Sequence, residues 1–416
     1  MIVITGSNPA RRDCELNEAG QASGYAFGVT RVHNPGDRVG NSSGVNLADR
    51  MPNRATRSID PLDRLQVNLR KKQIPGLDGI RGIAALSVVG FHDQLANHPD
   101  WFGRIYPGRF AVHVFFVISG LLITWLLLKE DQRDGSVNRA MFYWRRAFRL
   151  FPALFALLVW QLFTNIPPAS TGNTIAAALY FANYYSIFYG RPGLQGLAQT
   201  WSLAVEEHFY LIWPQVFVFV RNWRTLLKGC LVVVALQIAW RLAAGFHGAH
   251  GYAELSTETV SYAALVGCML ALLLWHAPHR MPRFVLHPVL TPISLAVILA
   301  LGLLPANAQQ IWGIPLGLPF AVILILQAIT YEWRLLENPV THHLGRISYS
   351  VYLWGLVAIE IVRKMGHDRY HLPAFAVAIA IGSASYFIIE RPFQSLGSRL
   401  ISRSKEQVRV PVPIAW

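Results

Sequence analysis

LDGIRGIAALSVVGFH, residues 77–92, is the point at which the chain first becomes strongly apolar. Asp78 and Arg81 stand at the entrance to this apolar run, and His92 lies inside it. In a helix of 3.6 residues per turn, Arg81 and His92 share one face and lie about 16 Å apart along the axis. Ionisable groups inside a membrane helix are costly, and they usually face the protein interior or a water-filled cavity. The stretch therefore predicts a membrane helix whose polar stripe has a functional role.

The composition of the whole chain indicates a polytopic membrane protein. Of 416 residues, 53% are hydrophobic and only 14% are charged, whereas a soluble domain has roughly 25% charged residues. The net charge of +14 comes from basic residues in short connections between apolar runs. That distribution is typical of positive-inside orientation and argues against a nucleic-acid partner. Cys14, Cys230 and Cys268 are too far apart to form a disulfide framework or a metal-binding motif.

Charge bias between the connections predicts the number of membrane spans. Ten apolar runs are long enough to cross a bilayer: 78–97, 109–128, 150–166, 203–220, 226–244, 259–276, 288–304, 311–330, 346–365 and 373–390. With the N-terminus inside, their cytoplasmic connections hold 17 Lys and Arg and the opposite connections hold seven. An eleventh candidate, 174–189, would invert every later connection if it crossed. We therefore expect an all-α polytopic membrane protein of about ten transmembrane helices with both termini cytoplasmic.

The domain organisation follows from where the apolar runs begin and end. Residues 1–70 are rich in Asn, Gly, Ser, Asp and Arg and show neither a sustained apolar period nor a signal-peptide core. We interpret them as a flexible cytoplasmic extension, within which Met51 would also serve as a start. Residues 71–400 then form the integral membrane domain, and 401–416 form a short cytoplasmic tail.

A basic and aromatic connection, NRAMFYWRRAFRLFP (138–152), carries Arg145, Arg146 and Arg149. Arg146 and Arg149 are three residues apart and share a helix face. A solvated positive-inside loop explains such arginines without a ligand. However, guanidinium groups bind phosphates bidentately and aromatic rings stack on nucleobases, so the cluster equally suits a phosphate ligand.

Further polar residues within or beside the apolar runs each have a structural and a functional interpretation. His92 is either a neutral imidazole bonded to another helix or a general base, since its ordinary pKa is about 6.5. Glu206, with Glu207 beside it, either complements a helix dipole or binds sugar hydroxyls and orients a base. The pair Ser119–Gly120 permits close helix packing or leaves room for a narrow substrate.

Two charged pairs have simple structural explanations. Asp78 and Arg81 could pair with each other at the start of their helix. Glu390 and Arg391, in YFIIERPF, are explained by snorkelling at the cytoplasmic edge and by helix termination at Pro392.

The order of several motifs resembles one known family. LDGIRGIAALSVVGFH is followed by VFFVISGLLIT, RRAFRLFP, TWSLAVEEHFYL, LGRISYSVYLW and IIERPF. This order, over residues 77–393, resembles the membrane-bound O-acyltransferases called acyltransferase family three, which modify surface sugars and lipid-linked glycans in bacteria. The resemblance implies a ten-span fold in the bacterial cytoplasmic (inner) membrane. It also implies transfer of an acyl group, commonly acetyl, from cytoplasmic acyl-CoA to a hydroxyl of an extracytoplasmic carbohydrate or glycolipid, without a metal.

The resemblance also assigns roles to individual residues. The family's basic-residue-x10-His motif falls on Arg81 and His92, with His92 as general base and Arg81 near the donor. Its carboxylate falls on Glu206, which would orient the imidazole or the sugar. Its R-x-x-R motif falls on Arg146 and Arg149, and its Ser-Gly pair falls on Ser119 and Gly120. From this placement we expect these two arginines and Arg145 beside them to hold the phosphates and adenine of acyl-CoA, with the pantetheine arm passing through a gap beside the Ser-Gly pair. One departure is Gly355, where members often have His.

Two other classes of protein remain as alternatives. Ten spans with buried Arg, His and Glu could form a proton-coupled exporter of a glycan or small metabolite. Transporters usually contain internal repeats, and the second half of this chain has no convincing copy of the His-bearing segment. A catalytically inactive scaffold is the third class, and the presence of Arg81, His92 and Arg149 argues against it.

Overall fold

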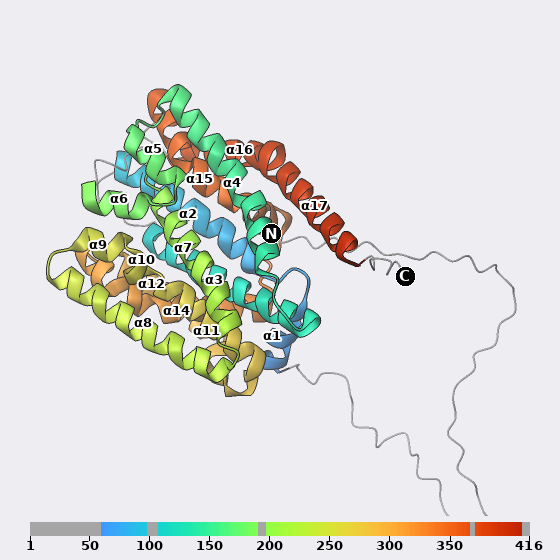
Figure 1. Cartoon of the computed structure of the whole chain (residues 1–416). Coiled ribbons are helices and arrows are strands. Elements are labelled where there is room, and N and C mark those ends of the chain that lie inside the picture. The colour runs from blue at the N-terminus through green and yellow to red at the C-terminus, as the bar shows by residue number, and fades with distance from the viewer. Residues whose placement is uncertain (1–59, 98–106, 190–196, 367–370, 410–416) are drawn as a thin grey trace, which may run out of the picture. The chain divides into compact units, whose positions relative to one another are not determined.

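The structure, a computed structural model, describes residues 60–97, 107–189, 197–366 and 371–409. Within these ranges the chain is helical and contains no strand (Figure 1). The longer helices are α1 (Pro61–Arg70), α2 (Leu77–Asn97), α3 (Gly108–Asp134), α4 (Arg139–Thr164), α5 (Thr171–Ala178), α6 (Ala182–Tyr189), α7 (Thr200–Phe219), α8 (Trp223–Phe246), α11 (Tyr262–His276), α12 (Leu290–Gly302), α14 (Ile314–Tyr331), α15 (Pro339–Lys364), α16 (His371–Ser385) and α17 (Arg391–Arg409). Short helices lie between them: α9 (His250–Leu255), α10 (Thr257–Val260), η4 (Pro278–Arg280), η5 (Arg283–Leu286), α13 (Ala306–Ala308), η6 (Gln309–Gly313) and η7 (Tyr386–Glu390).

The helices confirm a multi-pass membrane protein. By length and composition, six helical segments in the described ranges are able to cross a membrane: Gly108–Asp134, Arg139–Thr164, Trp223–Phe246, Ala306–Tyr331, Pro339–Lys364 and Leu372–Ser402. Each of the ten apolar runs in the sequence lies mostly in helical structure, and the run 259–276 is divided between α10 and α11. The count of ten spans and the location of the termini stay predictions. Two long helices, α2 and α7, are outside the six, and these two carry His92 and Glu206.

The segment 174–189 does not form one continuous helix. It is divided between α5 and α6, and Tyr180 between them has a positive φ of 54°. Each of these helices has eight residues and is about 12 Å long, whereas the hydrocarbon core of a bilayer is about 30 Å thick. Neither helix is long enough to span.

The first predicted domain boundary coincides with the end of a helix, and the second lies inside one. Residues 61–70, expected within the flexible extension, form α1, which packs against α14 with Leu65 and Leu69 fully buried. Leu62, Leu65 and Leu69 have the i, i+3, i+7 spacing of one helix face, but over ten residues this is too short to give a sustained apolar period, so the prediction was wrong here. α17 runs through the expected boundary at residue 400. Residues 1–59 and 410–416 lie outside the described residues.

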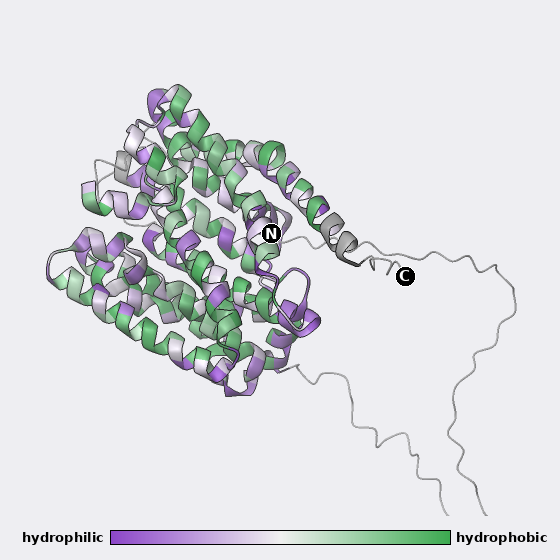
Figure 2. Ribbon diagram, viewed as in Figure 1, coloured by the Kyte–Doolittle hydropathy of each residue, from purple (hydrophilic) through white to green (hydrophobic). Residues whose placement is uncertain are grey.

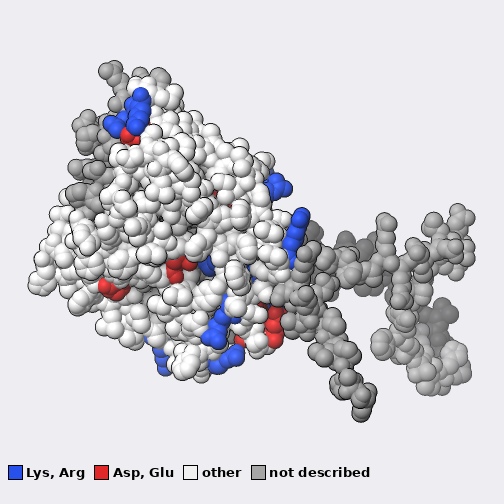
Figure 3. All heavy atoms as spheres, turned by 45° about the horizontal axis from the view of Figure 1, so that its top comes forward, with Lys and Arg blue, Asp and Glu red and all other residues white. Residues whose placement is uncertain are grey.

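Large apolar side chains cover the outside of the helices, as a lipid-facing surface requires. Phe155 and Phe163 on α4 and Leu231 and Leu236 on α8 are all more than half exposed, and apolar residues are spread over the ribbons in Figure 2. On the face in Figure 3, charged side chains are few and most of the surface is uncharged. In a bilayer, lipid acyl chains would contact these exposed apolar side chains. Polar residues with a functional role are therefore expected in the interior of the helix bundle.

Glycines bring the interior helices into close contact. A Cβ on Gly120 of α3 would overlap the carbonyl oxygen of Ala264 in α11, and one on Gly267 of α11 would overlap the carbonyl oxygen of Val117. A Cβ on Gly345 of α15 would likewise overlap the backbone of Asp78 at the start of α2. Small residues allow such backbone contact between membrane helices. They hold α2, α3, α11 and α15 together around the polar residues described next.

Candidate active site

The first polar group inside the bundle is the arginine cluster, which we define as Arg81, Arg146 and Arg149. Arg81 comes from α2 and the other two come from α4. All three are partly buried, and both Arg81 and Arg146 lie within electrostatic range of Arg149. Positive charges packed together in the interior repel one another unless anions compensate them.

Protein carboxylates supply part of that compensation. Glu390, on η7, interacts with Arg149 and Arg81 and accepts a hydrogen bond from Ser350. Glu207 forms an ion pair with Arg146 at 3.9 Å. The prediction that Glu390 snorkels to the membrane edge was wrong, because its side chain is only 2% exposed. Its pairing with arginines from two other helices draws it inward.

Several buried polar atoms beside the arginine cluster have no hydrogen-bond partner among the described residues. The guanidinium of Arg146 lies over the ring of Tyr210, a cation–π contact. Its Nε, the Oε1 of Glu207 and the hydroxyl of Tyr180 are buried without a hydrogen-bond partner among the described residues. Since buried polar atoms are normally bonded, three such atoms together indicate a place for a polar ligand or water.

Glu206 and Ser119, both singled out in the sequence, meet beside this cluster. Ser119 Oγ donates a hydrogen bond of 2.5 Å to Glu206 Oε1, and the hydroxyl of Tyr210 donates to the same oxygen. Gly120 serves packing, because α11 occupies the space that a side chain there would fill. The expected gap beside Gly120 is therefore closed on that side.

A second polar group, which we call the histidine cluster, surrounds His92 near the other end of α2. His92 is partly buried and lies within electrostatic range of Arg109 and Glu254. Arg109 Nε and Glu254 Oε1 are 2.9 Å apart. Gln310 Nε2 donates a 2.6 Å hydrogen bond to the other oxygen of Glu254. A carboxylate held in this way can support a charge that develops on a neighbouring imidazole.

The two clusters lie at different depths. Arg81 and His92 are about 16 Å apart along α2. Gly108 of α3 packs against Phe91, next to His92. Ser119 follows eleven residues later on the returning helix, so it and its partner Glu206 lie level with Arg81. The expectation that Glu206 orients the His92 imidazole does not fit this register. Glu254 is a carboxylate that does lie within electrostatic range of His92.

Arg145 and Asp78, which were also considered from the sequence, have surroundings in the structure that differ from those expected. Arg145 is exposed, whereas Arg146 and Arg149 are partly buried. Asp78, expected to pair with Arg81, accepts a 2.6 Å hydrogen bond from Gln73. Among the described residues there is no group of three His, Cys, Asp or Glu side chains arranged to hold a metal ion.

Sequence reasoning did not single out four residues that form contacts at these clusters: Arg109, Glu254, Gln310 and Tyr210. Arg109 is the second residue of α3 and Glu254 is the fifth of the six residues of α9, and charged residues are ordinary near helix ends. Tyr210 follows Glu206 by one helical turn, and that i, i+4 spacing was the available signal. Glu254 was not detectable, because its partners are 145 and 56 residues away.

The fold and these two clusters define a helical multi-pass membrane protein with charged sites inside its bundle. Residues 74–389 match the family described as "Acyltransferase domain". Because this match covers most of the sequence, the chain belongs to that family. It confirms the resemblance that the motif order indicated.

Known relatives are O-acetyltransferases by name. The chain is 27% identical over 379 residues to a provisionally named O-acetyltransferase of Staphylococcus aureus strain COL, covering 80% of this chain and 59% of the relative. It is 29% identical over 368 residues to YrhL of Bacillus subtilis strain 168, provisionally named a peptidoglycan O-acetyltransferase, covering 80% and 56%. It is 27% identical over 368 residues to O-acetyltransferase OatA of S. aureus strain NCTC 8325, covering 80% and 59%. The chain thus spans somewhat more than half of each relative's length. No solved structure matches it.

Proposed function

We propose that the protein is an O-acyltransferase that moves an acetyl group from cytoplasmic acyl-CoA to a hydroxyl of an extracytoplasmic carbohydrate or glycolipid. It would act in the cytoplasmic membrane of a bacterium, with residues 71–400 as the catalytic domain. Family membership supports the reaction class. The observation that carries the proposal is the placement of the arginine and histidine clusters at two depths of α2.

The arginine cluster suits the donor. Acyl-CoA carries phosphates at one end and its thioester at the end of a long, thin arm. Arg146 and Arg149 face the interior, with Arg81 beside them, and their guanidinium groups can bind phosphate oxygens bidentately. The arm would run along α2 toward His92. Ser119 and Tyr210 hold Glu206 at the donor level, where its negative charge compensates the arginines.

The histidine cluster suits the transfer step. The His92 imidazole would accept the proton of the acceptor hydroxyl as that oxygen attacks the thioester carbonyl carbon. The C–S bond then breaks, and the departing sulfur takes up a proton to leave as free CoA. Glu254, held by Arg109 and Gln310, would stabilise the imidazolium that forms. No covalent enzyme intermediate is required.

His92→Ala tests this assignment. General-base catalysis contributes roughly 10²- to 10⁴-fold to a rate, so the variant should lose acetyl transfer by that factor while it still binds acetyl-CoA. His247→Ala, at an exposed position after α8, is the matched control and should keep full activity. The measurement is transfer of labelled acetyl to a glycan acceptor by full-length protein in nanodiscs. Full activity of His92→Ala would overturn the base assignment.

The same assay distinguishes an acyltransferase from the two alternative classes of protein, an exporter and an inactive scaffold. An exporter or a scaffold would yield no acylated product with any candidate acceptor. Mass spectrometry of surface glycans from cells with and without the protein would identify the acceptor among the products.

A further inference from the structure

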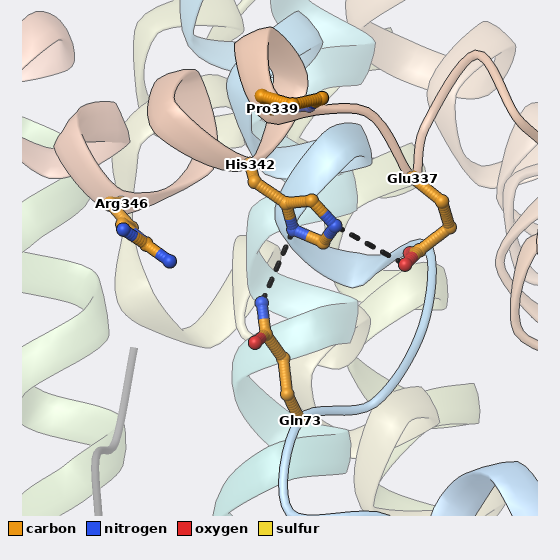
Figure 4. Close-up of a pocket in the computed structure, with 5 residues that line it drawn as sticks. All are labelled: Gln73, Glu337, Pro339, His342 and Arg346. Atoms are coloured by element: carbon orange, nitrogen blue, oxygen red, sulfur yellow. Dashed lines mark hydrogen bonds and ion pairs between the residues drawn. The ribbon is translucent and has the colours of Figure 1, made fainter.

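A cavity of about 320 Å³ lies at the end of the bundle where α2 and α15 begin. It is lined by Gln73, Glu337, Pro339, His342 and Arg346 (Figure 4). None of these residues belongs to the arginine or histidine cluster. Its volume is within the range of pockets that hold small ligands, about 300–1,000 Å³.

The carboxylate of this cavity is already paired. His342 Nε2 and Glu337 Oε2 are 3.3 Å apart, and Glu337 also accepts a hydrogen bond from the backbone N–H of Gly76. The Gln73 amide bridges His342 Nδ1 at 3.2 Å and Asp78 at 2.6 Å. The negative charges at the cavity are therefore engaged with neighbouring groups.

Arg346 is the unpaired charge of the cavity. It is exposed, and it makes no ion pair or hydrogen bond with any described residue. In Figure 4 it lies on the side of His342 opposite Glu337. His342 and Gln73 are engaged with each other, with Glu337 and with Asp78. Arg346 is therefore the donor of this lining that is left for a ligand, and a guanidinium suits a phosphate.

The cavity is in line with the arginine cluster. His342, Arg346 and Ser350 are spaced four residues apart on α15, so they form a stripe about 12 Å long on one helix face. Ser350 donates to Glu390, which interacts with Arg149 and Arg81. A ligand with two phosphate-bearing parts could thus contact Arg346 near the surface and the arginine cluster further in.

We propose that this cavity binds the phosphate on the adenosine ribose of the acyl-CoA donor, with Arg346 as its main contact. This inference rests on the proposed function and extends it, because it assigns the outer end of the donor to residues outside the arginine cluster. The diphosphate would then lie further along the α15 stripe, at the arginine cluster, and the arm would continue along α2 toward His92. The acyl group would lie deepest.

Equilibrium binding of CoA and dephospho-CoA, which lacks only the ribose phosphate, tests the proposal. Full-length protein in phosphatidylcholine nanodiscs would be titrated by calorimetry at constant ionic strength. A charge-assisted hydrogen bond contributes about 1.5–3 kcal/mol, so wild type should bind CoA about tenfold to a hundredfold more tightly. In Arg346→Gln this preference should disappear, and Arg346→Lys should restore part of it. Arg334→Gln, an exposed arginine outside the cavity lining, should keep the preference.

The possible results are distinguishable. Equal binding of the two nucleotides by wild type, or a full preference in Arg346→Gln, would overturn the cavity assignment while leaving the proposed function intact. No binding of either nucleotide by wild type would overturn the donor assignment and the cavity assignment together. A preference that vanishes when phosphatidylglycerol is added to the nanodiscs would assign the cavity to a lipid phosphate instead.

Discussion

Arg145, Arg146 and Arg149 stand within five residues of one another, and the exposure of each side chain distinguishes them. Arg146 lies over Tyr210 and pairs with Glu207, and Arg149 interacts with Arg81 and Glu390. Arg145 is exposed. The helical phase of α4 therefore assigns two arginines to the interior and one to the surface.

This difference gives a prediction for donor binding. Arg146→Ala and Arg149→Ala should each weaken acyl-CoA binding by about tenfold to a hundredfold, since each removes a charge-assisted contact of about 1.5–3 kcal/mol. Arg145→Ala, the matched control, should change affinity less than twofold. Equilibrium binding of labelled acetyl-CoA to nanodisc protein measures all three. Equal losses in the three variants would mean that general basic charge holds the donor.

At the scale of elements, the contact between α3 and α11 depends on two glycines. Gly120 and Gly267 each face a backbone carbonyl of the other helix. Backbone atoms cannot move aside as a flexible side chain can, so a methyl group at either position must separate the helices.

Gly120→Ala should therefore destabilise the protein by about 3 kcal/mol, at the upper end of overpacking effects. Gly229→Ala on α8, where an added Cβ meets nothing within 4 Å, should instead stabilise by about 0.5–1 kcal/mol through helix propensity. Unfolding free energies in mixed detergent micelles give both values. Stability of Gly120→Ala equal to that of the wild type would contradict the contact.

Three short elements meet at Glu258 of α10. Its carboxylate accepts hydrogen bonds from Tyr184 of α6, at 2.6 Å, and from Tyr252 of α9. Burial raises the pKa of Glu258, but the hydrogen bonds from the two tyrosine hydroxyls, a backbone hydrogen bond and the nearby His208 together outweigh it, so the pKa lies below its ordinary value of 4.5. A lowered pKa means that the folded protein favours the ionised form.

The stabilisation from Glu258 should therefore be complete above pH 4.5 and lost as the pH falls through the lowered pKa. Glu258→Gln should reduce the unfolding temperature at pH 7, and this difference from wild type should shrink below pH 4.5. Tyr184→Phe combined with Glu258→Gln should cost little more than Glu258→Gln alone. A difference that stays constant with pH would exclude an ionic contribution.

At the scale of the whole molecule, the path of the chain through the membrane depends on whether 174–189 crosses. The α3–α4 connection and the α8–α9 connection are separated by α4, α5, α6, α7 and α8. If α5 and α6 do not cross, three spans lie between the two connections, which then face opposite sides of the membrane.

Cysteine labelling tests this path. In a chain whose native cysteines are replaced, Ser136→Cys should react with an impermeant thiol reagent only after cells are opened, and Ala249→Cys should react in intact cells. Both positions are exposed in connections between helices. Labelling of both from the same side would mean that 174–189 crosses the membrane.

Most of the helices follow from local properties of the sequence. A long apolar run has few alternatives to a helix in lipid, because every backbone group must be bonded within the segment. The ten runs therefore coincide mostly with helical structure, and periodicity placed Arg81 with His92 and Arg146 with Arg149 on common faces.

The partners of each polar side chain were decided by tertiary structure. Glu206 bonds to Ser119, and Glu254 lies within electrostatic range of His92, because the register of α2 against α3 sets the depth of each group. Glu390 is buried because arginines on two other helices attract it. Such contacts join residues far apart in the chain, so local pattern and helical phase do not specify them. Apolar length thus determined where the helices form, and the packing of those helices determined which charges meet.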